Sequence, residues 1–178
     1  MFFSSFLSGV LILAGLTPQN LSSCKLIAPI SVGYKATISD PFRQPICDRC
    51  AGNRGIEYTT KPGTPIIAGA SGFVSFSGVV ANTNYLVIKT AGGKRLTYGS
   101  ILNSDLHIGS SVVVGQIVGT TSNMLYFGVR ESSALGDIYV DPAKYLNQNN
   151  QFLSRAVLVS GASTGFDLVD SGDRDSAC

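Results

Sequence analysis

Charged residues are scarce in this chain of 178 residues: they make up 13% of it, and the net charge is only +2. No cluster of lysine and arginine appears, so the sequence gives no indication of a nucleic-acid partner. Neither an internal repeat nor a long helical periodicity is evident. The apolar content of 44% nevertheless argues against a wholly disordered chain and suits one packed, β-rich domain.

Charge is absent altogether from the first 23 residues, and Lys25 is the first charged residue. Residues 2–16 are largely apolar, and a polar stretch at 17–20 ends the run. A membrane-spanning helix needs about 20 apolar residues, so this run is short for an anchor and typical of the core of a secretion signal, although no basic residue precedes it. We therefore predict a signal sequence over residues 1–23 and an extracytoplasmic protein. A buried N-terminal helix is the alternative.

Only four cysteines are present: Cys24, Cys47, Cys50 and Cys178. Residues 21–24 look like a lipobox, which predicts lipidation of Cys24 and a membrane lipid anchor, with simple secretion as the alternative. Cys47 and Cys50 form a single CxxC pair, and no second pair completes a structural zinc site. In an exported protein we expect them to form a local disulfide. Cys178 is left to pair with Cys24 if that residue is not lipidated.

Short apolar runs separated by glycine- and proline-containing turns dominate residues 29–146. They predict strands near residues 30–36, 56–60, 66–68, 73–77, 85–89, 95–98, 112–114, 116–118, 125–130 and 138–140. Gly92 and Gly93 predict a hairpin, and Asp141 followed by Pro142 predicts the start of a short helix over residues 143–146. The predicted fold class is all-β: an antiparallel β sandwich or open barrel with a short C-terminal helix. Residues 24–28 are expected to be a linker, and residues 147–178 a flexible tail.

Two segments, residues 52–57 and 124–130, carry the polar residues that we expect to form a cleft. In the second, alternation places Tyr126 and Arg130 on the face opposite to its apolar residues. If the two segments are neighbouring strands, Asn53, Glu57 and Tyr126 meet in one cleft.

The order and spacing of several short segments carry a family resemblance; these are residues 54–56, 62–66, 70–74, 112–119, 125–130 and 141–146. Together they resemble the lysostaphin/LytM-type zinc endopeptidases, which cut peptide cross-bridges in bacterial cell walls. The similarity covers residues 29–146, and it is greatest to actinobacterial forms with a CxxC pair before the first motif. It implies the β-sheet fold of that family and, in its active members, a zinc cofactor.

The resemblance places the family's zinc ligands at Asn53, Glu57 and Tyr126, and its assisting residues at Met124 and Ser100. A catalytic zinc needs three protein ligands. Asn53 offers a neutral amide, and the unperturbed pKa of a tyrosine is about 10, which leaves Glu57 as the one good ligand. Met124 cannot transfer a proton. We therefore expect no metal and no catalytic residue at these positions.

Two interpretations of the cleft stay open. Asn53, Glu57 and Tyr126 are either solvated or space-filling residues of an emptied site, or part of a retained binding groove in which Arg130 pairs with Glu57. A zinc site rebuilt from Cys47, Cys50, Glu57 and His107 is conceivable. His107 is more simply a surface or loop histidine.

The predicted function is that of a catalytically inactive, extracytoplasmic relative of the peptidoglycan metalloendopeptidases. Its partner would be peptidoglycan or a cell-wall hydrolase. The alternative is an active cell-wall metalloendopeptidase with altered ligands. A third hypothesis is a lipid-anchored structural domain whose partner is another envelope protein.

Overall fold

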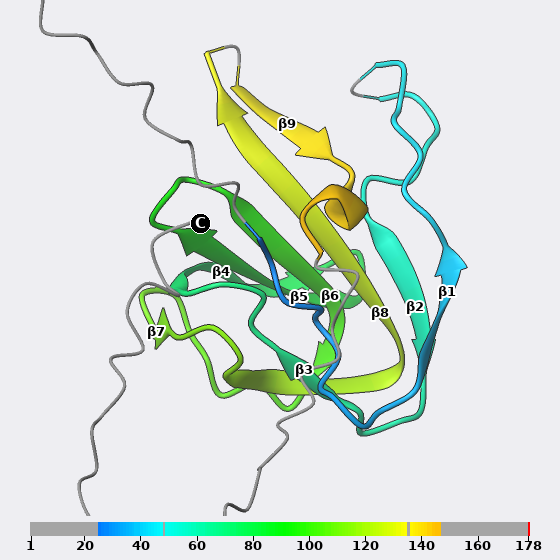
Figure 1. Ribbon diagram of the computed structural model, residues 1–178, viewed down its shortest axis with the longest axis vertical. Helices are drawn as coiled ribbons and strands as arrows, with labels where there is room; N and C mark the ends of the chain where they lie inside the picture. Colours follow the sequence, from blue (N-terminus) through cyan, green and yellow to red (C-terminus); the bar gives the residue numbers. More distant parts are fainter. Residues whose placement is uncertain (1–24, 48, 135, 147–177) are drawn as a thin grey trace, which may run out of the picture.

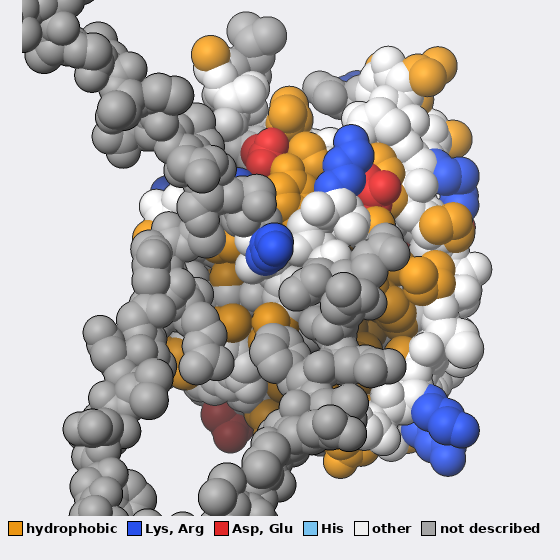
Figure 2. All heavy atoms as spheres, in the orientation of Figure 1, with side chains coloured by type: hydrophobic (Ala, Val, Ile, Leu, Met, Phe, Trp, Pro, Cys, Tyr) orange, Lys and Arg blue, Asp and Glu red, His pale blue; other side chains and the backbone are white. Residues whose placement is uncertain are grey.

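The computed structural model describes residues 25–47, 49–134, 136–146 and 178 (Figure 1). The predicted signal sequence, the lipidation of Cys24 and nearly all of the predicted tail lie outside these residues. Within the described part of the chain, no helix has both the length and the apolar character needed to cross a membrane. On the face shown in Figure 2, the few charged side chains of the described residues lie scattered among apolar and uncharged polar ones.

The described residues form one sheet in which every pair of neighbouring strands is antiparallel (Figure 1). The strands are β1 (Ala36–Asp40), β2 (Ile56–Thr60), β3 (Pro65–Ile67), β4 (Gly72–Val80), β5 (Thr83–Thr90), β6 (Arg95–Leu102), β7 (Ser111–Val112), β8 (Ile117–Ser133) and β9 (Gly136–Val140). Their order is β1-β2-β8-β6-β5-β4-β7, and both β3 and β9 pair with β8. The predicted all-β antiparallel class is confirmed.

The central strand is β8, which is 17 residues long and pairs with β2, β3, β6 and β9. Its bend lets the first part run beside β3 and the later part lie between β2 and β6 (Figure 1). Glu57 of β2 lies directly opposite Tyr126 of β8, which confirms that the two motif segments are neighbouring strands. Leu125, Phe127 and Val129 are fully buried, as the alternation predicted.

The core lies on one face of β5, β6 and the second half of β8. Its largest buried side chain, Tyr98, packs against Phe127 with ring centroids 5.3 Å apart, and its hydroxyl accepts a hydrogen bond of 2.8 Å from the Gly69 amide. Leu26 is also fully buried, and its amide donates to the Tyr145 carbonyl. The N-terminal end of the described chain is thereby fixed to its C-terminal part.

Tight turns connect the longest strands. Ala81 and Asn82 join β4 to β5 with φ angles of +47° and +64°, which is the left-handed backbone that a two-residue hairpin of this kind requires. The hairpin predicted at Gly92 and Gly93 is confirmed between β5 and β6. Cys178 lies against this hairpin, where its carbonyl accepts hydrogen bonds from Thr90 Oγ1 and the Gly92 amide. Cys178 is disulfide-bonded, whereas the predicted partner Cys24 lies outside the described residues.

Two predicted elements are wrong. The C-terminal helix is only a single 3-10 turn, η1 (Pro142–Lys144), although the Asp141 side chain does accept the capping hydrogen bond from the Ala143 amide. The turn stops because the backbone of the next two residues pairs with the N-terminal segment: the Tyr145 carbonyl accepts from the Leu26 amide, and Leu146 bridges to Leu26.

The strand predicted over residues 30–36 is the second error. Ile30 forms only an isolated bridge with Ile66, and the first strand begins at Ala36. A turn interrupts the alternating segment, because the Tyr34 amide donates to the Ser31 carbonyl and Gly33 adopts a φ of +91°. Alternation of side chains in sequence did not reveal this reversal of the backbone.

Candidate functional site

A groove of about 590 Å³ lies on the face of the sheet opposite to the core. Strands β4, β5, β6, β8 and β9 all contribute to it. Its lining residues are Ser75, Phe76, Val80, Tyr85, Val87, Arg95, Thr97, Tyr126, Arg130 and Tyr139. Two of the three predicted groove residues, Tyr126 and Arg130, are among them, whereas Glu57 is not.

The ring of Tyr126 fills the end of the groove that is nearest to β2. It lies over two glycines: a Cβ added at Gly55 would come 2.7 Å from ring carbons, and one at Gly128 would come 2.8 Å from the hydroxyl oxygen. Its edge meets Tyr85, with ring centroids 6.4 Å apart and the planes at 79°. Burial raises the pKa of the Tyr126 hydroxyl, so the neutral phenol is favoured even more than in water.

Asn53 is buried, with 6% of its surface exposed, and its amide group is used at both ends. Nδ2 donates to the carbonyls of Asp40 and Pro41 at 3.3 and 3.2 Å, and Oδ1 accepts from the Gly55 amide at 3.3 Å. The side chain thereby holds the loop before β2 against the end of β1. Its amide oxygen already accepts a hydrogen bond from a backbone amide, so the role of Asn53 in this arrangement is to stabilise the loop.

Glu57 lies close enough to Arg43 for the two charges to interact. Hydrogen bonding to Asp40 is the main cause that raises the pKa of Arg43, and the charge of Glu57 adds to it. Within the described part of the chain, Arg130 and Glu57 form no ion pair, so that hypothesis is wrong. The reason is geometric: Arg130 packs against the ring of Tyr139 on β9, which pairs with β8 beyond the segment that pairs with β2.

The remaining predicted site positions lie on β6 and β8. Ser100 stands at an irregularity of β6 between Gly99 and Ile101, with a φ of +62°, and Gly99 is directly opposite Tyr126. Met124 is opposite Thr59 of β2. The structure therefore brings the positions named by the resemblance onto three adjoining strands and the loop that precedes β2.

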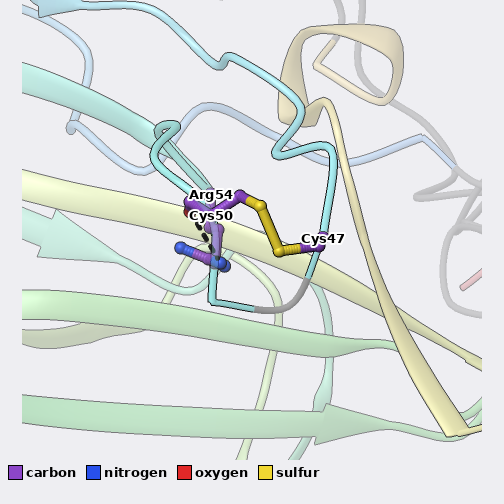
Figure 3. Close-up of a disulfide and its surroundings, with 3 residues drawn as sticks. All are labelled: Cys47, Cys50 and Arg54. Carbon is purple, nitrogen blue, oxygen red and sulfur yellow. Dashed lines mark hydrogen bonds between the residues drawn. A yellow bond between two sulfur atoms is a disulfide. The ribbon is translucent and has the colours of Figure 1, made fainter.

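Cys47 and Cys50 form the predicted disulfide, with their Cα atoms 5.0 Å apart (Figure 3). Arg54 Nη2 donates to the Cys50 carbonyl at 3.4 Å, so the disulfide loop is connected to the residues that lead into β2. With both sulfurs bonded to each other, neither is a thiolate that could ligate zinc in this state. His107 is exposed in the loop between β6 and β7, which confirms a surface or loop histidine.

A zinc of the family type does not fit the side chains present. No group of three or more His, Cys, Asp and Glu side chains among the described residues is arranged to hold a metal ion. At the three positions that the family resemblance assigns to ligands, the amide of Asn53 is hydrogen-bonded, Tyr126 is a covered phenol and Glu57 alone is a carboxylate. A catalytic zinc usually requires three ligands drawn from His, Cys, Asp and Glu, with an open fourth position.

Sequence reasoning missed the groove residues Tyr85, Arg95 and Tyr139. Tyr139 is directly opposite Arg130, and both Arg54 and Arg130 stack on its ring, with their guanidinium carbons 5.5 and 5.7 Å from the ring centroid. Arg95 is opposite Arg130 on the other side and forms an ion pair with Asp137. The alternation of residues 138–140 could have placed Tyr139 on one face, but only the register shows that this face is the one bearing Arg130.

The chain belongs to peptidase family M23, whose model matches residues 51–141 and so includes most of the sheet and the groove. It is 27% identical over 100 residues to the uncharacterized protein Rv2891 of Mycobacterium tuberculosis and to a counterpart in Mycobacterium bovis. The match covers 51% of this chain and spans only 40% of the length of these relatives.

Solved structures show the same fold. Csd3 of Helicobacter pylori is 28% identical with a TM-score of 0.58, over 70% of this chain and 35% of that one. The catalytic domain of the antimicrobial peptidase lysostaphin from Staphylococcus simulans is 21% identical with a TM-score of 0.51, over 63% and 91%. A chain of the SpoIIQ–SpoIIIAH pore forming complex is 15% identical with a TM-score of 0.59, over 76% and 99%. The last two likenesses show the fold alone.

Proposed function

We propose that this domain is a non-catalytic member of family M23 that acts outside the cytoplasm, where it binds peptidoglycan or regulates a cell-wall hydrolase. The observation that carries the proposal is the packing of Tyr126 on Gly55 and Gly128, at the position where the family resemblance expects a ligand histidine. The hydrogen-bonded amide of Asn53 supports it, because the first ligand position is then committed to the backbone. The groove is retained on this scaffold, which supports binding in place of cleavage.

The extracytoplasmic location rests on the predicted signal sequence over residues 1–23 and on the disulfide between Cys47 and Cys50, since disulfides persist in oxidising compartments. Lipidation of Cys24 or simple secretion would both deliver the domain there. Membership of this peptidase family, together with the likeness in fold to the antimicrobial peptidase lysostaphin, supports a cell-wall context. The SpoIIQ–SpoIIIAH complex supports a binding role, because it is a pore forming assembly that contains a chain of this fold.

The second candidate is a metalloendopeptidase with altered ligands. It is favoured by one observation: Glu57 keeps a carboxylate directly opposite Tyr126, beside the irregularity at Ser100. Such an enzyme would need Glu57 for metal binding, because the other two positions supply no ordinary zinc ligand.

The test uses the oxidised chain with purified peptidoglycan, with added zinc or with a chelator. We expect the protein to sediment with the wall, to release no soluble peptide, and to hold substoichiometric zinc after mild chelation. Glu57→Ala should behave like the parent, and so should Asp105→Ala, which removes an exposed carboxylate from a loop. Zinc-dependent peptide release that is lost in Glu57→Ala and kept in Asp105→Ala would establish the enzyme instead. Capture of an envelope protein from membranes, without binding to the wall, would favour the structural domain.

A further inference from the structure

The groove carries a basic side chain that no described residue neutralises by contact. Arg95 and Arg130 both line it, and Arg54 lies over the ring of Tyr139 at its edge. The charge of Arg95 is taken up by Asp137 in an ion pair. Arg130 has no such partner in the described part of the chain, since the ion pairs there involve other residues.

Arg130 is also short of hydrogen bonds. Its Nε is buried, and it is the one buried side-chain nitrogen or oxygen atom of the described residues that has no hydrogen-bond partner. An uncompensated buried donor is costly, and the large majority of buried polar atoms in folded proteins are paired. Tyr139 stacks on the guanidinium but accepts no hydrogen bond from it. The fold therefore holds a positive group in place with its Nε donor unused.

The residues around Arg130 indicate which class of ligand its guanidinium group could bind. Arg54 stacks on the same ring of Tyr139, so the local field favours an anion rather than a second cation. A guanidinium offers donors in a planar fork that matches the two oxygens of a carboxylate. The hydroxyls of Ser75 and Thr97 supply further polar groups on the groove wall, and Phe76, Val80 and Val87 supply apolar surface. A volume of about 590 Å³ is within the usual range for a small ligand.

We infer that the groove binds the C-terminal carboxylate of a short peptide, with the guanidinium of Arg130 as the anion-binding group. The terminal residue lies against the apolar wall formed by Phe76, Val80 and Val87, and the tyrosines enclose the sides. This inference rests on the proposed function, because it assigns a ligand class to the groove that the non-catalytic domain retains. It adds the requirement that the peptide end in a free acid.

The experiment compares N-acetyl-trialanine with its C-terminal amide, using the full oxidised chain in the presence of a chelator. Calorimetry gives the affinities, and the Nε–H resonance of Arg130 in a ¹⁵N-labelled sample reports on its donor. We expect the acid to shift that resonance and to bind about tenfold or more tighter than the amide, since only the acid forms a charged hydrogen bond. Inorganic phosphate is a third probe, and it should bind more weakly than the acid.

Variants test whether Arg130 is responsible for the preference for the acid over the amide. Arg130→Gln should bind acid and amide equally, and Arg130→Lys should keep part of the preference because it keeps the charge. Lys61→Gln removes the same charge from an exposed turn outside the groove and should keep the full preference. The comparison of acid with amide uses the parent chain, so it holds even if Arg130→Gln folds poorly. Circular dichroism checks the fold of each variant.

Three results would overturn the inference: equal binding of acid and amide, no binding of the acid at millimolar concentration, or phosphate binding as tight as the acid. Retention of the acid preference in Arg130→Gln would overturn it too. Failure of the proposed function has a different signature, which is cleavage of the probe or of the wall in the presence of zinc, detected by mass spectrometry. The two outcomes are independent, because an enzyme could bind a peptide acid and an inert domain could ignore it.

Discussion

The substitution Gly55→Ala tests whether the ring of Tyr126 really fills the position that the family resemblance assigns to a metal ligand. A Cβ at residue 55 would lie 2.5 Å from the Phe127 carbonyl oxygen and 2.7 Å from two ring carbons of Tyr126. Real Cβ atoms essentially never come so close, so the ring or β8 must move. Overpacking of this kind typically costs 1–3 kcal/mol, and we expect about 2–3 kcal/mol because one of the contacts is backbone.

The second half of the test is a double-mutant cycle with Tyr126→Ala. Truncation of a buried aromatic residue costs about 3–5 kcal/mol, and the part-exposed Tyr126 should lie near 2–3 kcal/mol. Removing the ring also removes its clash with the new methyl group, while the clash with the Phe127 oxygen remains. The double variant should therefore be less destabilised than the sum of the single changes, by about 1 kcal/mol.

Reversible urea unfolding followed by circular dichroism gives the three free energies, since the chain has no tryptophan for fluorescence. Gly78→Ala is the matched control: a Cβ there would lie 3.4 Å from the nearest atom of Phe76, so we expect it to be neutral or slightly stabilising. Additivity of Gly55→Ala and Tyr126→Ala within about 0.5 kcal/mol would refute the packing of the ring on Gly55. So would a Gly55→Ala variant as stable as Gly78→Ala.

Three further predictions concern stability. Replacing both Cys47 and Cys50 by serine opens a loop with a sequence separation of only 3, so the urea midpoint should fall by the equivalent of about 2 kcal/mol or less; a larger loss would mean that the disulfide does more than close the loop. The Tyr145 hydroxyl, and secondly Lys94, lower the pKa of Glu131, so this carboxylate stabilises the fold above the usual glutamate pKa of about 4.3 and the effect is lost on acidification. The difference in melting temperature between the parent and Glu131→Gln should thus shrink from pH 7 to pH 3, and an unchanged difference would contradict the assignment. Burial raises the pKa of Tyr58 to about 12, so the neutral phenol stabilises the fold fully below pH 10, and this stabilisation is lost as the pH rises toward 12. The Tyr58→Phe variant should therefore show a smaller fall in melting temperature at alkaline pH than the parent, and an identical fall in both would rule this out.

Much of the fold could be predicted because it depends on local chemistry. Alternation identified the buried face of residues 125–130, the glycine pair identified the β5–β6 hairpin, and Asp141 with Pro142 identified a capped turn. The errors arose where a distant contact overrode a local preference. Leu146 bridges to Leu26, 120 positions earlier in the chain. This contact ends the C-terminal turn, although the local sequence predicts that a helix continues there.

Part of the candidate site could likewise be predicted from local chemistry, and part depended on distant contacts. The sequence could show that Asn53 and Tyr126 are poor zinc ligands, because that follows from their functional groups. It could not show that the amide of Asn53 donates to the carbonyls of Asp40 and Pro41, or that Tyr126 lies on Gly55, since those contacts depend on how β2 is placed beside β1 and β8. The mistaken pairing of Arg130 with Glu57 has the same origin, because Glu57 lies opposite Tyr126, whereas Arg130 lies further along β8, where β9 rather than β2 is the neighbouring strand.

The charge of the groove connects the two proposals. A site for a divalent cation gathers carboxylates and neutral imidazoles, and basic residues beside it raise the cost of placing the cation there. Here the guanidinium groups of Arg54 and Arg130 lie close enough to Tyr126 to pull its pKa downward against the larger effect of burial. They lie near the position that the family resemblance assigns to a metal ligand, and Arg130 forms no ion pair with any residue that the structure describes. The same charges that disfavour zinc in this groove favour a carboxylate, so both proposals rest on one electrostatic arrangement.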